Sequence, residues 1–215
     1  MLGLLSKLSE VRLHHGSDAY YFSAITKTRL PPDISDRIIA LPGMSRVRHG
    51  RPSNGGEVAL YFHKDLQWEL IEDPVNVVQG SPWCRLRLKG DGNCLVVVIY
   101  RPTSSTPEVD SHLASATRRV LNTNFSHIHI TDDFNIHALE SQAAYGEQFK
   151  VDLQKLVSSY PKYGLSNTHT RFREEYAPSI LVRIFTNQEL MVEKVAVDVP
   201  LSRNAHALLL RIHSL

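Results

Sequence analysis

The segment from His127 to Asp133 alternates apolar and polar residues and predicts a β-strand. Two isoleucines alternate with two histidines at the two-residue period of a strand, and the pattern stops at a pair of aspartates. Asn135 follows two residues after Asp133. At the end of a strand the backbone leaves the sheet, so polar side chains can gather there without breaking ladder hydrogen bonds. We interpret Asp133 and Asn135 either as part of a functional site or as the cap of a turn.

The other apolar segments show strand and helix patterns in turn. Helical spacing of apolar residues predicts helices, and short apolar runs bounded by turn residues predict strands. The predicted helices cover residues 1–13, 107–121 and 149–160, and the predicted strands cover residues 19–25, 58–62, 83–88, 95–100, 180–185 and 207–212. Residues 89–93, with the sequence Lys-Gly-Asp-Gly-Asn, predict a hairpin between two of these strands. Without repeats or linkers, the pattern indicates one α/β domain over residues 1–215.

The composition is that of a globular protein. The chain has 215 residues, of which 42% are hydrophobic, and can bury one sizeable core. Lys and Arg number 24 against 22 for Asp and Glu, so any basic surface for nucleic acid would have to be local. No apolar run approaches the roughly 18 residues of a membrane helix, and no secretory signal is evident. We therefore expect an intracellular protein, nuclear or cytoplasmic, that is neither secreted nor bound to a membrane.

Cys84 and Cys94 are the two cysteines of the chain. An intracellular protein keeps its thiols reduced, which argues against a disulfide framework. The register set by the predicted hairpin also leaves these two residues out of directly opposed positions. We expect no disulfide between them.

His127 and His129 lie two residues apart and would share one face of the predicted strand. Two histidines at this spacing can bind a metal ion, but no third ligand follows nearby. Both interpretations stay open, and the missing third ligand favours a partly exposed sheet face over a metal pair.

Two arginine clusters could contact phosphate groups or could simply be solvated. Arg46, Arg48 and Arg51 follow a turn, and Arg171 and Arg173 lie in a charged segment. Arginine is a common phosphate ligand in nucleic-acid complexes, but exposed arginines are also frequent on ordinary protein surfaces.

Six segments of the chain occur in the order found in one protein family. They are residues 24–30, 100–102 (Tyr-Arg-Pro), 130–135, 170–171 (Thr-Arg), 179–187 and 200–208. The chain resembles the endonuclease/exonuclease/phosphatase domain, and within it the endonuclease that accompanies the reverse transcriptase of LINE-type non-LTR retrotransposons. The resemblance covers nearly the whole chain. It implies a four-layer α/β sandwich, in which helices flank two packed mixed β-sheets, and Mg²⁺-dependent cleavage of a DNA phosphodiester at one sheet edge.

The same resemblance assigns roles to individual residues. Tyr100 matches the tyrosine that contacts the phosphate, Asp133 the aspartate that orients the attacking water, Asn135 the asparagine beside it, and His206 the closing histidine. Asp133 is also the remaining candidate ligand for Mg²⁺ in this set. The candidate contacts for DNA are Arg51, Arg101 and Arg171.

Three acids of the family pattern are replaced in this chain. Lys27 stands at the principal metal-binding glutamate, Val182 at the acidic partner of the histidine, and Ala205 at a further acid on the metal side. Mg²⁺ is held by carboxylate oxygens in near-octahedral geometry, and an ammonium group repels it. The first strand of the family has no counterpart in this sequence, so we expect the N-terminal strand to be missing.

The resemblance implies a retrotransposon-derived domain, and these substitutions predict that its catalysis is impaired and its Mg²⁺ binding weakened or lost. Two alternatives remain. The chain could be a non-catalytic remnant or pseudoenzyme that binds nucleic acid, or an active endonuclease in which another residue, such as Asp132, replaces the missing ligands.

Overall fold

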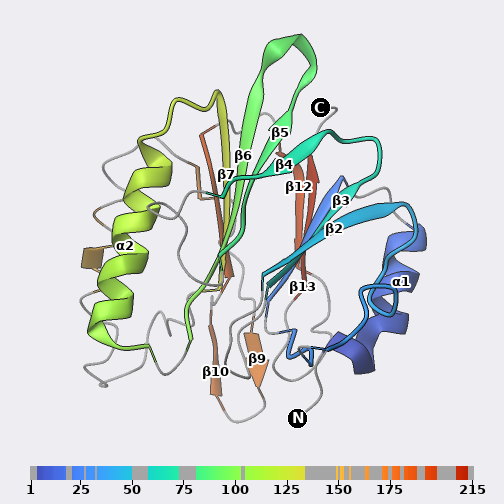
Figure 1. Cartoon of the computed structure of the whole chain (residues 1–215). Coiled ribbons are helices and arrows are strands. Elements are labelled where there is room, and N and C mark those ends of the chain that lie inside the picture. The colour runs from blue at the N-terminus through green and yellow to red at the C-terminus, as the bar shows by residue number, and fades with distance from the viewer. Residues whose placement is uncertain are drawn as a thin grey trace.

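Two large β-sheets, a separate two-stranded hairpin and two main helices are the principal elements of the described part of the chain (Figure 1). The computed structural model describes residues 4–17, 21–26, 28–31, 33–49, 58–72, 81–102, 105–133, 149, 151–152, 155, 163–164, 171–173, 176–179, 182–187, 192–197 and 207–212. None of the helices in these ranges is long and apolar enough to cross a membrane.

One sheet has five strands in the order β12-β13-β1-β3-β2, with every neighbouring pair antiparallel. Its strands are β1 (Phe22–Thr26), β2 (Met44–His49), β3 (Val58–His63), β12 (Val192–Val197) and β13 (Ala207–Ile212). The short helix η1 (Leu4–Lys7) and helix α1 (Leu8–Ser17) precede β1 and pack on the outer face of this sheet. Leu8 and Val11 of α1 are buried there with Ile25 and Tyr61.

The second sheet has six strands in the order β4-β5-β6-β7-β11-β8. Its strands are β4 (Trp68–Leu70), β5 (Trp83–Arg87), β6 (Asn93–Tyr100), β7 (His127–Asp133), β8 (Tyr163–Gly164) and β11 (Val182–Thr186). The short helix η2 (Lys89–Asp91) connects β5 to β6. Strands β6 and β7 are parallel because helix α2 (Pro107–Leu121) carries the chain back between them. A separate two-stranded hairpin consists of β9 (Arg171–Arg173) and β10 (Tyr176–Ser179).

Local sequence explains where α2 begins and which face it buries. Thr106 is the N-cap, and its hydroxyl accepts a hydrogen bond from the backbone N–H of Val109. Pro107 occupies the first turn, where a missing N–H costs nothing. Apolar residues at helical spacing, including Leu113 and Val120, pack on the outer face of the six-stranded sheet.

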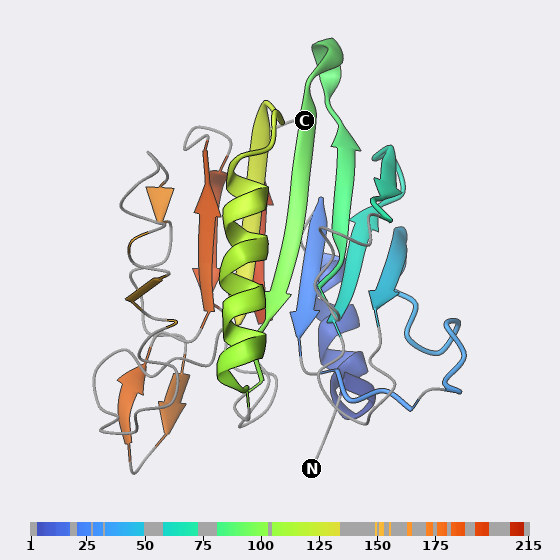
Figure 2. The same ribbon diagram turned by 60° about the vertical axis from the view of Figure 1, so that its left-hand side comes forward.

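The two sheets pack face to face around a shared apolar core. The five-stranded sheet contributes Phe22, Ala24, Val58, Leu60 and Phe62, and the six-stranded sheet contributes Cys84, Leu86, Cys94, Val96, Val98 and Tyr100. Helices α1 and α2 cover the two outer faces (Figures 1 and 2). The resulting order of layers is helix, sheet, sheet, helix, which confirms the four-layer sandwich.

The sequence patterns predicted most of these elements. The helix at 107–121 and the strand at 207–212 agree to the residue, and the strands at 58–62, 83–88 and 95–100 agree to within two residues at either end. The opening helix was placed too early, because its α-helical part runs from residue 8 to residue 17. Of the predicted helix at 149–160, only residues 149, 151, 152 and 155 are described, and all four are helical.

Several strands of the structure were not predicted from the sequence. Strands β4 and β8 are short, and β12 carries charged residues. Strand β2 alternates as a strand should, but Arg46 and Arg48 occupy one of its faces, and the sequence indicated only that these arginines could contact phosphate or be solvated.

Cys84 and Cys94 are free thiols in the core between the sheets. Leu86 lies opposite Cys94 and Val96 lies opposite Cys84, so the register keeps the two cysteines apart as predicted. Burial raises the pKa of both thiols to about 12.

Candidate functional site

Three neighbouring strands of the six-stranded sheet meet at one row of residues. The parallel register pairs Tyr100 of β6 with Asp133 of β7, and the antiparallel register pairs Asp133 with Val182 of β11. Directly opposed residues on adjacent strands lie on the same face of a sheet. Three of the predicted site positions therefore lie side by side.

Strand β1 of the other sheet ends at the same place. The Oγ1 of Thr26, the last residue of β1, donates a hydrogen bond to Oδ2 of Asp133 at 3.1 Å. Asp133 is only 1% exposed, so this bond joins the two sheets inside the protein. The next strand, β13, begins at Ala207, which lies opposite Ile25. The ends of β1, β6 and β7 and the beginnings of β11 and β13 thus define one end of the sandwich, which we call the site end.

The remaining predicted positions lie outside the described residues. These are Lys27, Asn135, Ala205, His206 and Arg51. Lys27 directly follows Thr26 in the sequence, and His206 directly precedes Ala207. Thr26 and Ala207 are both at the site end. The β9–β10 hairpin, which carries Arg171, lies at the lower end of the molecule in both ribbon views (Figures 1 and 2).

The described residues of the site end do not form a set of Mg²⁺ ligands. Mg²⁺ demands six oxygen ligands in near-ideal geometry, with carboxylates supplying the charge. In the described ranges, no three side chains of His, Cys, Asp or Glu come close enough to hold a metal ion. The carboxylate of Asp133 accepts a bond from Thr26, and its neighbour on β11 is a valine.

The arrangement of strands matches known structures. The chain is similar to an AP endonuclease from Archaeoglobus fulgidus, with a TM-score of 0.70, 12% identity, and coverage of 98% of this chain and 96% of that one. For the endonuclease domain of TRAS1, a telomere-specific non-LTR retrotransposon, the TM-score is 0.65, the identity 14% and the coverage 97% and 92%. For the 3′ phosphatase NExo from Neisseria, bound to a product DNA hairpin, the TM-score is 0.63 and the identity 13%, with coverage of 98% of this chain and 95% of that one.

The chain has the endonuclease/exonuclease/phosphatase fold. No family model matches its sequence, and no curated protein does so either. At 11–14% identity to the solved structures of this fold, the chemistry has to be judged from the residues themselves.

Within this endonuclease/exonuclease/phosphatase fold, Arg101 is an interior residue. It is 4% exposed, and its Nε and Nη2 donate to the two carboxylate oxygens of Asp110 at 2.7 and 2.8 Å. The hydroxyl of Ser105 also donates to Asp110, at 2.6 Å, and the guanidinium lies 5.5 Å from the centre of the Phe149 ring. The backbone N–H of Arg101 donates to the carbonyl oxygen of Asp133 at 3.0 Å. These contacts join β6, α2 and β7, and they do not fit the expectation that Arg101 contacts DNA.

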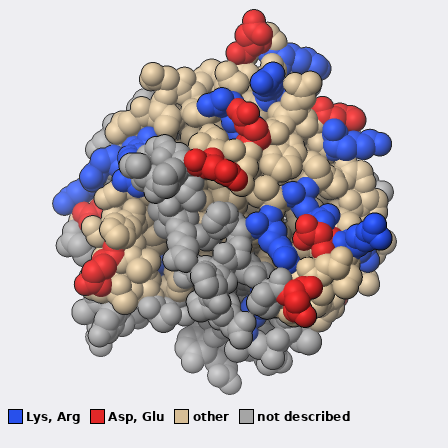
Figure 3. Space-filling model, in the orientation of Figure 1, with Lys and Arg blue, Asp and Glu red and all other residues tan. Residues whose placement is uncertain are grey.

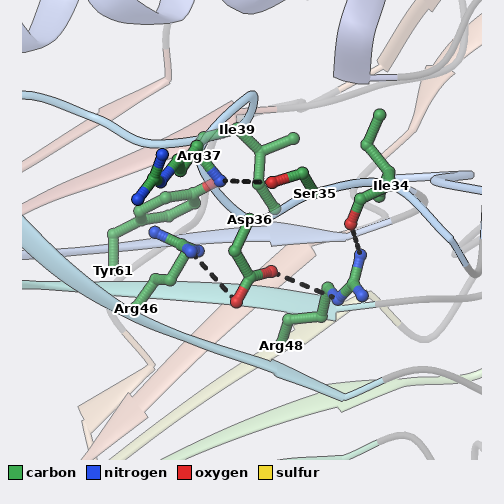
Figure 4. Close-up of polar contacts among 8 residues, drawn as sticks. All are labelled: Ile34, Ser35, Asp36, Arg37, Ile39, Arg46, Arg48 and Tyr61. Carbon is green, nitrogen blue, oxygen red and sulfur yellow. Dashed lines mark hydrogen bonds and ion pairs between the residues drawn. The ribbon is translucent and has the colours of Figure 1, made fainter.

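Arg46 and Arg48 are also engaged within the protein (Figure 4). Nη2 of Arg46 lies 2.9 Å and Nε of Arg48 lies 3.7 Å from the carboxylate of Asp36. Arg48 donates in addition to the carbonyl oxygen of Ile34 at 3.3 Å. The two arginines therefore hold the segment before β2 against the sheet, and they are not a surplus of free positive charge. Figure 3 likewise shows acidic and basic side chains interspersed over the described part of one face.

His129 corrects the expectation of a partly exposed histidine face. It is fully buried because α2 covers one face of β7 and the other sheet covers the opposite face. His127 is half-buried, with its Nδ1 2.8 Å from the hydroxyl of Ser126. No third ligand joins the two histidines in the described ranges, so a metal pair gains no support.

Two residues of this region were missed by sequence reasoning. Thr26 lies inside a segment that carries the family resemblance, but its contact with Asp133 depends on the packing of one sheet on the other. Asp110 lies in the first turn of α2, where acids are common in any helix, so no local signal marked it as the partner of Arg101.

The Arg101–Asp110 pair yields a stability prediction. Replacement Asp110→Asn keeps the shape of the side chain but leaves the buried guanidinium without its carboxylate. We expect the free energy of unfolding, measured with urea, to fall by about 3–5 kcal/mol. The matched control is Glu69→Gln, which removes the carboxylate from an exposed pair with Arg85 at 2.8 Å and should cost about 0–1 kcal/mol. Equal losses in the two variants would contradict a structural role for the buried pair.

Proposed function

We propose that this chain is a retrotransposon-type endonuclease domain that has lost most of its metal-dependent cleavage and keeps DNA as its partner. The observation that carries the proposal is the row formed by Tyr100, Asp133 and Val182. A phosphate-contacting side chain and a catalytic carboxylate remain, while the residue beside that carboxylate has become apolar.

Cleavage of a phosphodiester makes demands that the chain meets only in part. A divalent ion has to neutralise the charge that builds on the phosphate, carboxylates have to hold that ion, and a base has to activate water. We assign orientation of the water to Asp133 and Asn135, and proton transfer to His206. The acids that would hold the ion are replaced by Lys27, Val182 and Ala205. We propose that the Lys27 ammonium pairs with Asp133, because in this sequence a cation replaces a metal-binding acid of the family while the carboxylate of Asp133 is retained.

DNA is the partner best supported by the comparisons. A phosphatase of the same fold is known with a product DNA hairpin. In this chain, Arg171 and Arg173 lie on β9, in the hairpin at the lower end of the molecule. We propose that these two arginines contact backbone phosphates, with Arg51 as a further candidate, and that a non-catalytic binding role is the alternative if no cleavage remains.

A plasmid-nicking assay tests the loss of cleavage. We expect no Mg²⁺-dependent nicking by the unmodified chain, because losing acids of the site costs several powers of ten in rate. Lys27→Glu alone should restore little cutting, since the histidine still lacks its acidic partner. The combined change Lys27→Glu, Val182→Asp and Ala205→Asp should restore nicking, because residues that act as a unit are strongly non-additive. Adding Asp133→Ala to this triple variant is the control and should abolish the gain.

Robust Mg²⁺-dependent nicking by the unmodified chain, lost on Asp133→Ala, would overturn the proposal. In that case Asp132, which lies opposite Arg183 next to the same row, is the first residue to test as a replacement ligand.

A DNA-binding titration over a range of salt concentrations tests the partner. Each phosphate contact lowers the slope of log affinity against log salt by roughly 0.9. Replacing Arg171 and Arg173 by alanine should therefore weaken binding and make the slope shallower by about one per arginine. Arg118→Ala is a matched control, because Arg118 is exposed in the last turn of α2, at the opposite end of the sheet from Asp133. An unchanged slope in the Arg171/Arg173 variant would exclude β9 as the DNA contact.

A further inference from the structure

Strand β7 presents polar residues to the space between the two sheets. Ile128 and Ile130 face α2, so the alternate residues His129, Thr131 and Asp133 face the other sheet. All three are buried, with 0%, 3% and 1% of their surface exposed. A polar column of this kind is unusual in an interface whose other described members are largely apolar.

His129 is the most constrained residue of this column. Its ring lies 6.2 Å from the ring of Phe22 on β1, and its neighbours across the sheet are Val96 on β6 and Thr186 on β11. Neither ring nitrogen has a hydrogen-bond partner within the described part of the chain. A neutral imidazole tolerates this position through packing, whereas an imidazolium would lose its hydration without gaining a counter-ion.

In the part of the chain that the structure describes, the titratable groups around His129 offer no compensating negative charge nearby. On β7 itself, His127 would add a like charge, and Asp133 lies four residues away, roughly 13 Å along an extended strand. The thiols of Cys94 on β6 and Cys84 on β5 face the same core and stay neutral because burial raises their pKa to about 12.

The remaining elements around His129 add no charge in the described ranges. Strand β1 presents Phe22 and Ala24 to this core, and β3 presents apolar residues. Strand β11 places Thr186 beside His129, and β13 places Leu210 opposite Phe22.

We propose that His129 makes the joint between the two sheets acid-sensitive, because its ring can stay between them only while it is neutral. Protonation then favours an opened form in which the ring reaches water. Since Thr26 and Asp133 are bonded across the same joint, opening would also take the site end apart. This device is independent of whether the chain cuts or binds DNA.

The direction and range of the effect follow from linkage. Burial lowers the pKa of His129 from 6.5 to about 4, with the charge of His127 as a smaller cause in the same direction. Between these values the opened form binds more protons than the closed form. The ratio of closed to opened form therefore falls as the pH decreases from 6.5 toward 4, by at most about tenfold per pH unit. Above pH 6.5 this residue contributes no pH dependence.

The two cysteines provide a direct readout of opening. They are the chain's two thiols, both lie in the core between the sheets, and both are at most 1% exposed. We would measure their labelling by 4,4′-dithiodipyridine, which reacts with thiols in acid as well, and divide the rate by that of the urea-unfolded chain at the same pH. For the unmodified chain, we expect this ratio to rise at least tenfold between about pH 7.5 and about pH 5.

Matched variants assign the effect to His129. His129→Phe keeps an aromatic ring without a titrating group and should leave the labelling ratio nearly independent of pH over this range. His112→Gln is the control, because His112 is exposed on α2, and should behave as the unmodified chain. A wild-type pH dependence in His129→Phe would overturn the proposal.

A second measurement needs no variant and decides the question if His129→Phe does not fold. The ring of His129 can be titrated by NMR in the unmodified chain. We expect it to stay neutral down to a pH of about 4. Titration of the folded protein near the ordinary value of 6.5 would overturn the proposal.

Discussion

Face-to-face packing of the two sheets is the constraint on which the rest of this structure depends. Neither sheet can bury its inner face alone, and the residues that fill the space between them come from both. This packing sets the positions at which β1, β6 and β7 end together, and it brings the hydroxyl of Thr26 to the carboxylate of Asp133. The site end is therefore a product of the packing between the two sheets.

The separation of the site end from the apolar core is consistent with the proposal that the acids of the site were replaced while the fold persisted. Val182 is the first residue of β11, whereas the stability of the sandwich rests on apolar residues farther inside, such as Phe22, Leu60 and Val96. A fold of this kind can carry different chemistry, or very little, on the same framework. Asp133 then acquires a structural role, because a buried carboxylate with a hydroxyl partner helps to join the two sheets.

Local sequence patterns predicted the elements whose formation depends on their own residues. They did not predict features that depend on contacts between distant parts of the chain. The N-cap and apolar spacing of α2 and the apolar run of β13 are complete signals within their own segments. Strand β2 was missed because its two arginines pair with Asp36, an interaction that no local pattern reveals. The same holds for the contact of Arg101 with Asp110 and for the full burial of His129, which requires a second sheet and a helix on either side of β7.

The sequence predicted which strand ends meet at the candidate site, but it predicted only some of the contacts between the side chains there. The ends of β6 and β7 brought Tyr100 and Asp133 together as the family resemblance implied, and the register placed Val182 beside them. The role of Thr26 could not be predicted, because it depends on how closely one sheet approaches the other.

Whether Asp133 still serves a metal ion is tested most directly by the urea midpoint of the unmodified chain, measured with EDTA and with Mg²⁺ at matched ionic strength. A site with a Kd of about 0.1 mM would stabilise the folded chain by about 2.7 kcal/mol at about 10 mM Mg²⁺. A carboxylate committed to the protein predicts the same midpoint in both conditions. A midpoint that rises with Mg²⁺ in the unmodified chain, but not in Asp133→Asn, would show that the metal site has been kept.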